Sequence, residues 1–139
     1  MNTDRPGKRI LLVDDEERIL EVLSRRLQSW GYEVLTGKTG EEGLQIAETA
    51  QPDLILLDIV MPTMRGREVC ARLKEDSRTK RIPVIFLTAL GMPEQVEAGI
   101  HLGAEDYIVK PFNPQEMKQR IEACLSRPDH DDRQVVSVR

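Results

Sequence analysis

The sequence has few cysteines, few aromatic residues and no long apolar run, and each shortage excludes a class of protein. Its two cysteines, Cys70 and Cys124, lie far apart and lack the paired spacing of a zinc site. We interpret them as reduced, buried hydrophobic residues within helices. No apolar run approaches the roughly 20 residues that a membrane-spanning helix needs, and Met1 to Lys8 contain no apolar stretch of signal-peptide length. These shortages predict a cytoplasmic location without membrane insertion.

The sequence also has no excess of basic residues. Lys and Arg number 20 against 24 Asp and Glu, which gives a net charge of -4. This balance supplies no positive field to attract nucleic acid phosphates or an anionic membrane surface. We therefore expect no direct binding to nucleic acid.

The length and the apolar content allow one folded domain. A chain of 139 residues that is 40% hydrophobic can bury one substantial core but not two ordinary ones. We expect a domain over residues 8–126, preceded by an N-terminal tail, 1–7. Residues 127–139 are interpreted as a flexible C-terminal tail or the stump of a linker, because they lack periodicity. Their composition leaves open whether an output domain follows.

Short apolar runs alternate with amphipathic stretches, which predicts a βαβα order. The runs are Ile10 to Val13, Val34 to Leu35, Leu54 to Leu57, Val84 to Leu87 and Tyr107 to Val109. The third run is apolar at every position, as expected for a strand of a parallel sheet with helices over both faces. The pattern predicts an α/β fold of the doubly wound, flavodoxin-like (βα)5 type: a three-layer sandwich with five parallel strands in the order 2-1-3-4-5.

Five helices are expected to follow these strands. The first carries an apolar stripe from Ile19 to Trp30, the second runs from Thr39 toward Ala50, the third begins near Gly66, the fourth spans about Pro93 to Leu102, and the fifth runs from Asn113-Pro114 to Leu125. Thr39 and Glu42 have the spacing of a capping box.

Four of the five predicted strands end in polar residues. These residues are Asp14 and Asp15 after the first strand, Asp58 after the third, Thr88 after the fourth and Lys110 after the fifth. Open doubly wound sheets bind ligands outside the carboxyl ends of their strands, where the strand order reverses. The predicted order therefore places three carboxylates, a hydroxyl and an ammonium in one crevice.

Each of these residues alone has an ordinary structural explanation. An Asp after a strand often caps a helix, Thr favours strands, and a Lys before Pro is usually solvated. Three clustered carboxylates, however, repel one another unless they are protonated or bridged by a cation. Oxygen ligands suit Mg²⁺, which often also binds phosphate oxygens. The set therefore predicts phosphoryl transfer, with Asp58 as nucleophile, Asp14 and Asp15 holding the cation, and Thr88 and Lys110 binding phosphoryl oxygens.

At these residues the sequence resembles the receiver domains of two-component response regulators, to which the bacterial chemotaxis regulator belongs. The matching segments are ILLVDDEE at 10–17, PDLILLDIVMP at 52–62, PVIFLTA at 83–89 and GAEDYIVKPF at 103–112. The resemblance covers about Lys8 to Ser126. All four segments, in this order and at this spacing, form a highly specific pattern.

The resemblance implies that Asp58 forms an acyl phosphate, with a histidine kinase or phosphotransfer protein as the donor. It implies a Mg²⁺ cofactor held by Asp15, Asp58 and the backbone carbonyl of Val60, with Asp14 contributing through water. Lys110 is implied to pair with the phosphoryl group. Such a protein is a phosphoacceptor switch, not an enzyme with turnover, and only self-directed phosphotransfer and autodephosphorylation are expected.

The resemblance also implies a switch. The hydroxyl of Thr88 moves to the phosphoryl group and the ring of Tyr107 turns into the space that it leaves, which biases a two-state surface. That surface comprises the fourth helix, fifth strand and fifth helix, roughly Met92 to Ser126. The expected partner on it is a downstream protein target, an output domain outside this chain, or a second copy forming a homodimer.

Two positions depart from the family pattern. Arg65 stands where the family commonly has Asp, and Val60 is apolar two places after the acceptor. Both are expected beside the pocket, where they affect the lifetime of the phosphoryl group more than its formation. His101 and His130 receive no role, since the first is expected on the surface of the fourth helix and the second in the tail.

Two other functions fit parts of the pattern. A magnesium phosphatase with an aspartyl nucleophile also combines carboxylates with Lys and Thr, but such enzymes carry Asp-x-Asp on the first strand and a cap insertion. This chain has adjacent Asp14 and Asp15 and no spare length. A flavin-binding module shares the predicted fold, but the low aromatic content and the absence of a Ser- and Thr-rich loop after the first strand disfavour it.

Overall fold

Strands and helices alternate along the described part of the chain, residues 7–89 and 93–126 of this computed structural model. The strands are β1 (Arg9–Val13), β2 (Glu33–Gly37), β3 (Leu54–Asp58), β4 (Val84–Ala89) and β5 (Asp106–Lys110). The helices are α1 (Glu17–Ser29), α2 (Gly40–Ala50), α3 (Gly66–Glu75), α4 (Pro93–His101) and α5 (Pro114–Leu125). Each predicted strand and helix is confirmed. Residues 1–6, most of the predicted N-terminal tail, lie outside the described residues, as do Met92 and the predicted tail 127–139.

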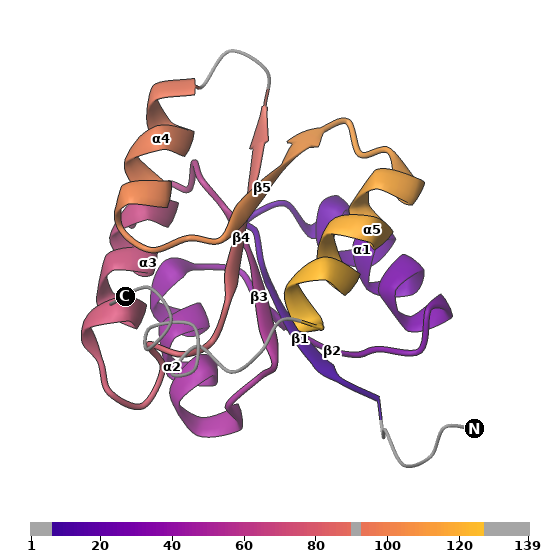
Figure 1. The fold of residues 1–139 in the computed structure, drawn as a ribbon, viewed down its shortest axis with the longest axis horizontal. Helices are drawn as coiled ribbons and strands as arrows, with labels where there is room; N and C mark the ends of the chain where they lie inside the picture. Colours follow the sequence, from indigo (N-terminus) through magenta and orange to yellow (C-terminus); the bar gives the residue numbers. More distant parts are fainter. Residues whose placement is uncertain (1–6, 90–92, 127–139) are drawn as a thin grey trace, which may run out of the picture.

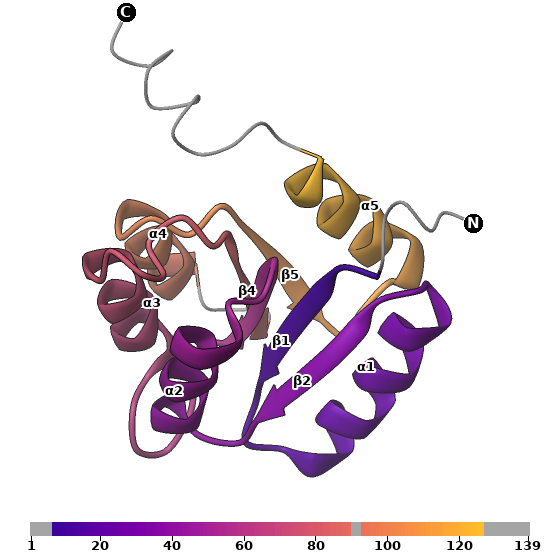
Figure 2. The ribbon, with the colours of Figure 1, turned by 90° about the horizontal axis from the view of Figure 1, so that it is seen from below.

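All five strands are parallel and form one sheet in the order β2-β1-β3-β4-β5, which confirms the predicted flavodoxin-like fold. Figures 1 and 2 show the sheet between two groups of helices, with α1 and α5 on one face and α2, α3 and α4 on the other. The central strand β3 is buried at every position. Its continuous apolar run is therefore explained by helices covering both of its faces.

Alternate side chains of each central strand enter different cores. Leu54 and Leu56 of β3 pack in the core beneath α1 and α5, whereas Ile55 and Leu57 pack in the core beneath α2, α3 and α4. This division follows from the two-residue period of a strand. The described part of the chain contains no helix that is long and apolar enough to cross a membrane.

Capping residues set the ends of the helices. The side chain of Thr39 accepts a hydrogen bond from the amide of Glu42 at the start of α2, and Asn113 caps α5 through the amide of Glu116. The carboxylate of Glu42 accepts from the amide of Lys38, one residue before the position that a capping box requires. The capping spacing therefore predicted the helix start correctly but not the second hydrogen bond.

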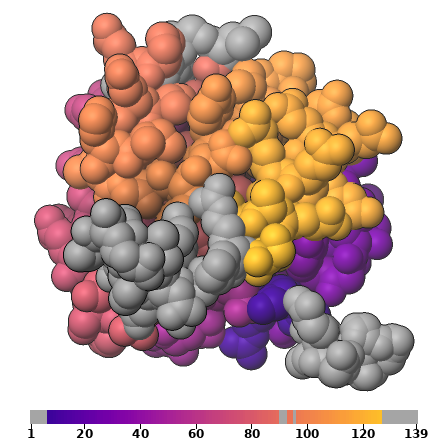
Figure 3. All heavy atoms as spheres, in the orientation of Figure 1, coloured from indigo at the N-terminus to yellow at the C-terminus, as the bar shows by residue number. Residues whose placement is uncertain are grey.

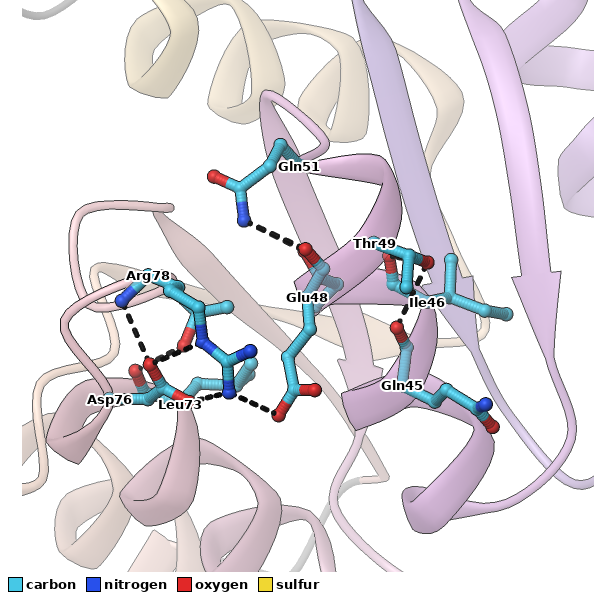
Figure 4. A network of polar contacts seen from close by, with 10 residues as sticks. Gln45, Ile46, Glu48, Thr49, Gln51, Leu73, Asp76 and Arg78 are labelled. Carbon is cyan, nitrogen blue, oxygen red and sulfur yellow. Dashed lines mark hydrogen bonds and ion pairs between the residues drawn. The ribbon is translucent and has the colours of Figure 1, made fainter.

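The two edges of the sheet differ in what they carry. We call the edge where the strands begin the amino edge and the edge where they end the carboxyl edge. At the amino edge, Arg78 contacts Asp76 in its own loop and Glu48 at the end of α2, at 2.9 and 3.2 Å (Figure 4). The hydroxyl of Thr79 donates to the carbonyl of Leu73 at 2.7 Å. These polar contacts tie α2 to the segment between α3 and β4.

Candidate functional site

A pocket of about 250 Å³ opens at the carboxyl edge of the sheet. Its lining residues come from the ends of four elements or the loops after them and are Asp15, Glu16, Asp58, Ile59, Val60, Thr88, Ala89 and Lys110. The strand order explains this convergence, because β3 lies between β1 and β4, and β5 follows β4. The pocket thus lies at the topological switch point, where the sequence predicted a ligand site.

Three carboxylates meet at this pocket. One oxygen from each of Asp14, Asp15 and Asp58 lies within 4.8 Å of the others. Asp14 is completely buried and Asp15 is exposed. Both oxygens of Asp14 have protein partners, because Oδ1 accepts from the amide of Glu16 at 2.9 Å and Oδ2 accepts from the ammonium of Lys110 at 3.3 Å. Asp15 presents its carboxylate to solvent instead.

Lys110 supplies the one ammonium that lines the pocket within the described residues. Its Nζ lies 3.3 Å from Asp14 Oδ2 and 3.6 Å from Asp58 Oδ1, between two carboxylates that would otherwise repel each other. The peptide bond from Lys110 to Pro111 is cis. When all three carboxylates are ionised, one ammonium leaves two negative charges uncompensated, which is the charge that a divalent cation balances.

Asp58 is nearly buried, with 7% of its surface exposed. Burial raises the pKa of its carboxyl group to about 7, and the neighbouring charge of Asp14 adds to this effect. The ammonium of Lys110 and a hydrogen bond from the amide of Val60 act in the opposite direction. Oδ1 receives both of those contacts, and Oδ2 has no hydrogen-bond partner in the described part of the chain. Oδ2 is therefore the free oxygen of this carboxylate.

The loop between β3 and α3 is closed by Gly66. The amide of Gly66 donates to the carbonyl of Ile59 at 2.8 Å. A Cβ atom at Gly66 would lie 2.3 Å from the backbone oxygen of Asp58 and 2.8 Å from the Cα atom of Ile59, closer than real contacts allow. Only glycine fits at this position, and the close approach fixes the course of the loop that carries Val60.

Thr88 and Tyr107 lie on neighbouring strands at different depths. Thr88 is 3% exposed, lines the pocket and donates its hydroxyl to the carbonyl of Ala89 at 3.2 Å. Tyr107 is 38% exposed, and its ring is not part of the pocket lining. The structure therefore places the two members of the predicted switch pair with the hydroxyl inside and the ring outside.

Two residues near the pocket differ from expectation. Glu16 lines it, although only the preceding aspartates were predicted there; the acidic run from 14 to 17 was the signal that could have found it. Arg65 is exposed and is not a lining residue, whereas Val60 lines the pocket as expected. The amide of Arg65 donates to Glu68 at 3.0 Å, which places Arg65 at the start of α3.

The sheet order and the acidic pocket define a flavodoxin-like protein with a polar site at its switch point. The chain belongs to the response regulator receiver domain family, whose model matches residues 10–122. Its relatives include a probable transcriptional regulator, ycf27, of Cyanophora paradoxa, 46% identical over 123 residues, and the alkaline phosphatase synthesis transcriptional regulatory protein PhoP of Bacillus subtilis, 43% identical. The match covers 88% of this chain and 50% of each relative, so the chain spans about half their length.

Solved structures agree with this assignment. A response regulator from Chloroflexus aurantiacus superposes with a TM-score of 0.83 at 37% identity, covering 87% of this chain and 99% of that one. The receiver domain of the sensor histidine kinase PA1611 from Pseudomonas aeruginosa has a TM-score of 0.81 at 29% identity, with 87% and 99% covered. In that structure a magnesium ion is coordinated in the active site cleft.

Proposed function

We propose that Asp58 accepts a phosphoryl group from a histidine kinase or phosphotransfer protein. Asp58 lines the open pocket, and its Oδ2 has no protein partner within the described residues; this observation carries the proposal. In the transfer, Oδ2 forms a bond to phosphorus while the bond from phosphorus to the donor nitrogen breaks, and the nitrogen keeps that electron pair. Attack of water on the same phosphorus later releases inorganic phosphate and restores the carboxylate.

The donor set fits a magnesium ion, because the described carboxylate cluster offers only oxygen ligands. We propose that Asp15, Asp58 and the backbone carbonyl of Val60 hold the ion directly. Asp14 acts through water, since both of its oxygens already have protein partners. When bound, the ion neutralises charge on the phosphoryl oxygens. The magnesium in the PA1611 receiver domain supports this assignment.

Lys110 and Thr88 complete the proposed site. The ammonium of Lys110 lies 3.6 Å from Asp58 and can follow the phosphoryl oxygens once they are present. Among the described residues, the hydroxyl of Thr88 has only the carbonyl of the next residue as its partner, at 3.2 Å, so a charged phosphoryl oxygen competes well for it. The apolar Val60 at the pocket supplies no group to position a hydrolytic water, and we propose that it lengthens the lifetime of the phosphoryl group.

The signal is proposed to leave through α4, β5 and α5. These elements adjoin on one face of the molecule, as the orange and yellow surfaces of Figure 3 show. Ile100, Leu102 and Tyr107 are large hydrophobic residues exposed there. We propose that this face receives a downstream protein, an output domain or a second copy of the chain. The relatives of twice this length are named as transcriptional regulators, which supports an output domain. The buried Cys70 and Cys124 are not in disulfides, which fits the reducing cytoplasm.

Phosphorylation of the intact chain tests this function. Wild-type protein is incubated with magnesium and acetyl phosphate, and its intact mass is measured. The expected result is a gain of one phosphoryl group by the wild type and none by Asp58→Asn. The matched control is Asp53→Asn, which changes an exposed aspartate just before the other end of β3 and should leave the gain intact. Equal gain by Asp58→Asn would overturn the proposal.

A further inference from the structure

Arg120 on α5 is held between carboxylates of two different elements. Its guanidinium contacts Asp106 of β5 at 2.5 Å and Glu116 of its own helix at 3.1 Å. A planar guanidinium that is fixed by two carboxylates has little remaining freedom. The orientation of the Arg120 side chain is therefore set by the docking of α5 beside β5.

The same guanidinium lies over the ring of Tyr107. The distance from Arg120 Cζ to the ring centroid is 5.4 Å, which is within the range of a favourable cation–π interaction. Asp106 joins the two residues a second time, because its Oδ1 accepts both from Arg120 and from the amide of Tyr107 at 2.8 Å. The outward position of the ring is thus supported by the guanidinium, which Asp106 holds beside the Tyr107 backbone.

We propose that Arg120 is a positioning residue that holds the ring of Tyr107 in its exposed position on β5 and so opposes switching. This inference rests on the proposed function and on the switch that the family resemblance implies, in which the ring turns inward after the hydroxyl of Thr88 moves. An inward ring leaves the guanidinium behind, because Asp106 and Glu116 keep it in place. Arg120 then stabilises the unphosphorylated arrangement selectively and sets how many molecules switch at a given level of phosphorylation.

The test follows the ring itself. The sequence has two tyrosines, so Tyr32→Phe leaves Tyr107 as the only site for 3-fluorotyrosine. The intact labelled protein is titrated with beryllofluoride in the presence of magnesium, as a probe for the phosphorylated state. In Arg120→Gln, the fluorine resonance of the free protein should move toward its position in the bound state. The apparent Kd for beryllofluoride should tighten about two- to fivefold, as loss of an exposed cation–π contact predicts.

Three comparisons make the result decisive. Arg120→Lys keeps a cation near the ring and should restore part of the wild-type behaviour. Arg25→Gln removes a similar ion pair within a helix, with Glu21 on α1, and it should change nothing. A Tyr107→Leu background carries no fluorotyrosine, so the affinity for beryllofluoride is compared in both backgrounds by isothermal titration calorimetry. There Arg120→Gln should no longer alter the affinity, since the contact is already absent. An equal effect of Arg120→Gln in both backgrounds would overturn the inference.

Failure of the proposed function gives a different pattern. In that case wild-type protein shows no magnesium-dependent response to beryllofluoride, and Asp58→Asn behaves like the wild type. If the wild type responds and Asp58→Asn does not, the function stands. A fluorine resonance that stays unmoved in free Arg120→Gln then rejects the role of Arg120 alone.

Discussion

The two edges of the sheet differ in how far protein groups neutralise their buried charges. At the amino edge, Lys74 lies 3.7 Å from Glu105 and donates to the carbonyls of Lys80 and Ile82, so a nearly buried cation is fully surrounded by acceptors. At the carboxyl edge, three carboxylates cluster beside one ammonium, which contacts Asp14 and Asp58, and Asp58 has an oxygen without a protein partner among the described residues. The amino edge is therefore organised for stability, whereas the carboxyl edge retains charge that a ligand can neutralise.

Glycines show the same contrast in the backbone. Gly31, before β2 at the amino edge, has a φ of +95° but no atom within 4 Å of an added Cβ. Gly66, after β3 at the carboxyl edge, has no room for a Cβ at all. Gly31 allows the positive φ that ends α1, and Gly66 allows its loop to pack closely against the acceptor strand β3.

The largest effect is expected from Gly66→Ala. The added Cβ would lie 2.3 Å from the backbone oxygen of Asp58, so the loop has to move. We expect the free energy of unfolding to fall by about 3 kcal/mol, as for overpacking at a site that cannot relax. Urea denaturation measures this change. The rate of phosphorylation by acetyl phosphate should fall as well, because the displaced loop carries Val60 and part of the pocket lining.

Gly31→Ala is the control for that prediction at the other edge. Its cost comes from the positive φ alone and should be about 1 kcal/mol. Phosphorylation should be unchanged. A loss of phosphorylation in Gly31→Ala as large as in Gly66→Ala would show that general destabilisation, rather than the loop beside Asp58, controls the site.

Lys74→Met is expected to produce the next largest effect. It removes the cation that faces Glu105, which is only 6% exposed in its side chain, and leaves two carbonyls without their donor. We expect a loss of about 2 kcal/mol in urea denaturation, since the amide of Val84 still donates to Glu105. Acetyl phosphate should modify the variant at the wild-type rate below its unfolding transition. Slower phosphorylation would show that the two edges are coupled.

The sequence predicts the carboxyl edge better than the amino edge, for a physical reason. Parallel strands bring their last residues to one place, so Asp58, Thr88 and Lys110 could be placed together from strand order alone. The pair formed by Lys74 and Glu105 follows no such rule. Each looks like an ordinary surface charge in the sequence, and only the packing of α3 beside the start of β5 brings them together.

Two other features near the site also depend on packing that the sequence does not show, namely the contact of Arg120 with Tyr107 and the position of Arg65. Arg120 received no role from the sequence, because its contact with Tyr107 depends on how α5 docks beside β5. Arg65 was expected beside the pocket because it stands in the loop after Asp58. It lies at the start of α3, as the sequence predicted, but it is exposed and does not line the pocket.

A smaller effect on the free energy of unfolding is expected from Asp58→Asn in metal-free protein. Burial first, and then the charge of Asp14, raise the pKa of Asp58 to about 7. Protonation therefore favours the native state, and this contribution is complete below the unfolded pKa of 3.8 and is lost as the pH rises toward 7. At pH 8 the variant should be more stable than wild type by about 1 to 2 kcal/mol in urea with a chelator. At pH 4 the difference should vanish.

For Asp76 at the amino edge, the pH dependence of its contribution to stability should have the opposite sign. Hydrogen bonds from the side chain and amide of Arg78 lower its pKa. Its stabilising contribution is present above the unfolded pKa and is lost as the pH falls through the native value. Asp76→Asn should therefore lose stability at neutral pH and converge with wild type in acid. The same sign of pH dependence for Asp58→Asn and Asp76→Asn would remove the electrostatic contrast between the edges.

The smallest effect is expected from Arg78→Ala, although Figure 4 shows its side chain at the centre of a polar network. Arg78 is 61% exposed, and water replaces its contacts to Asp76 and Glu48 readily. We expect the free energy of unfolding to change by less than about 0.5 kcal/mol, as for other exposed ion pairs. Thr79→Val is the matched change in the same loop, and it should cost more, about 1 kcal/mol, because the buried hydroxyl donates to Leu73. If Arg78→Ala costs more than Thr79→Val, stability at the amino edge depends on its surface network rather than on its buried groups.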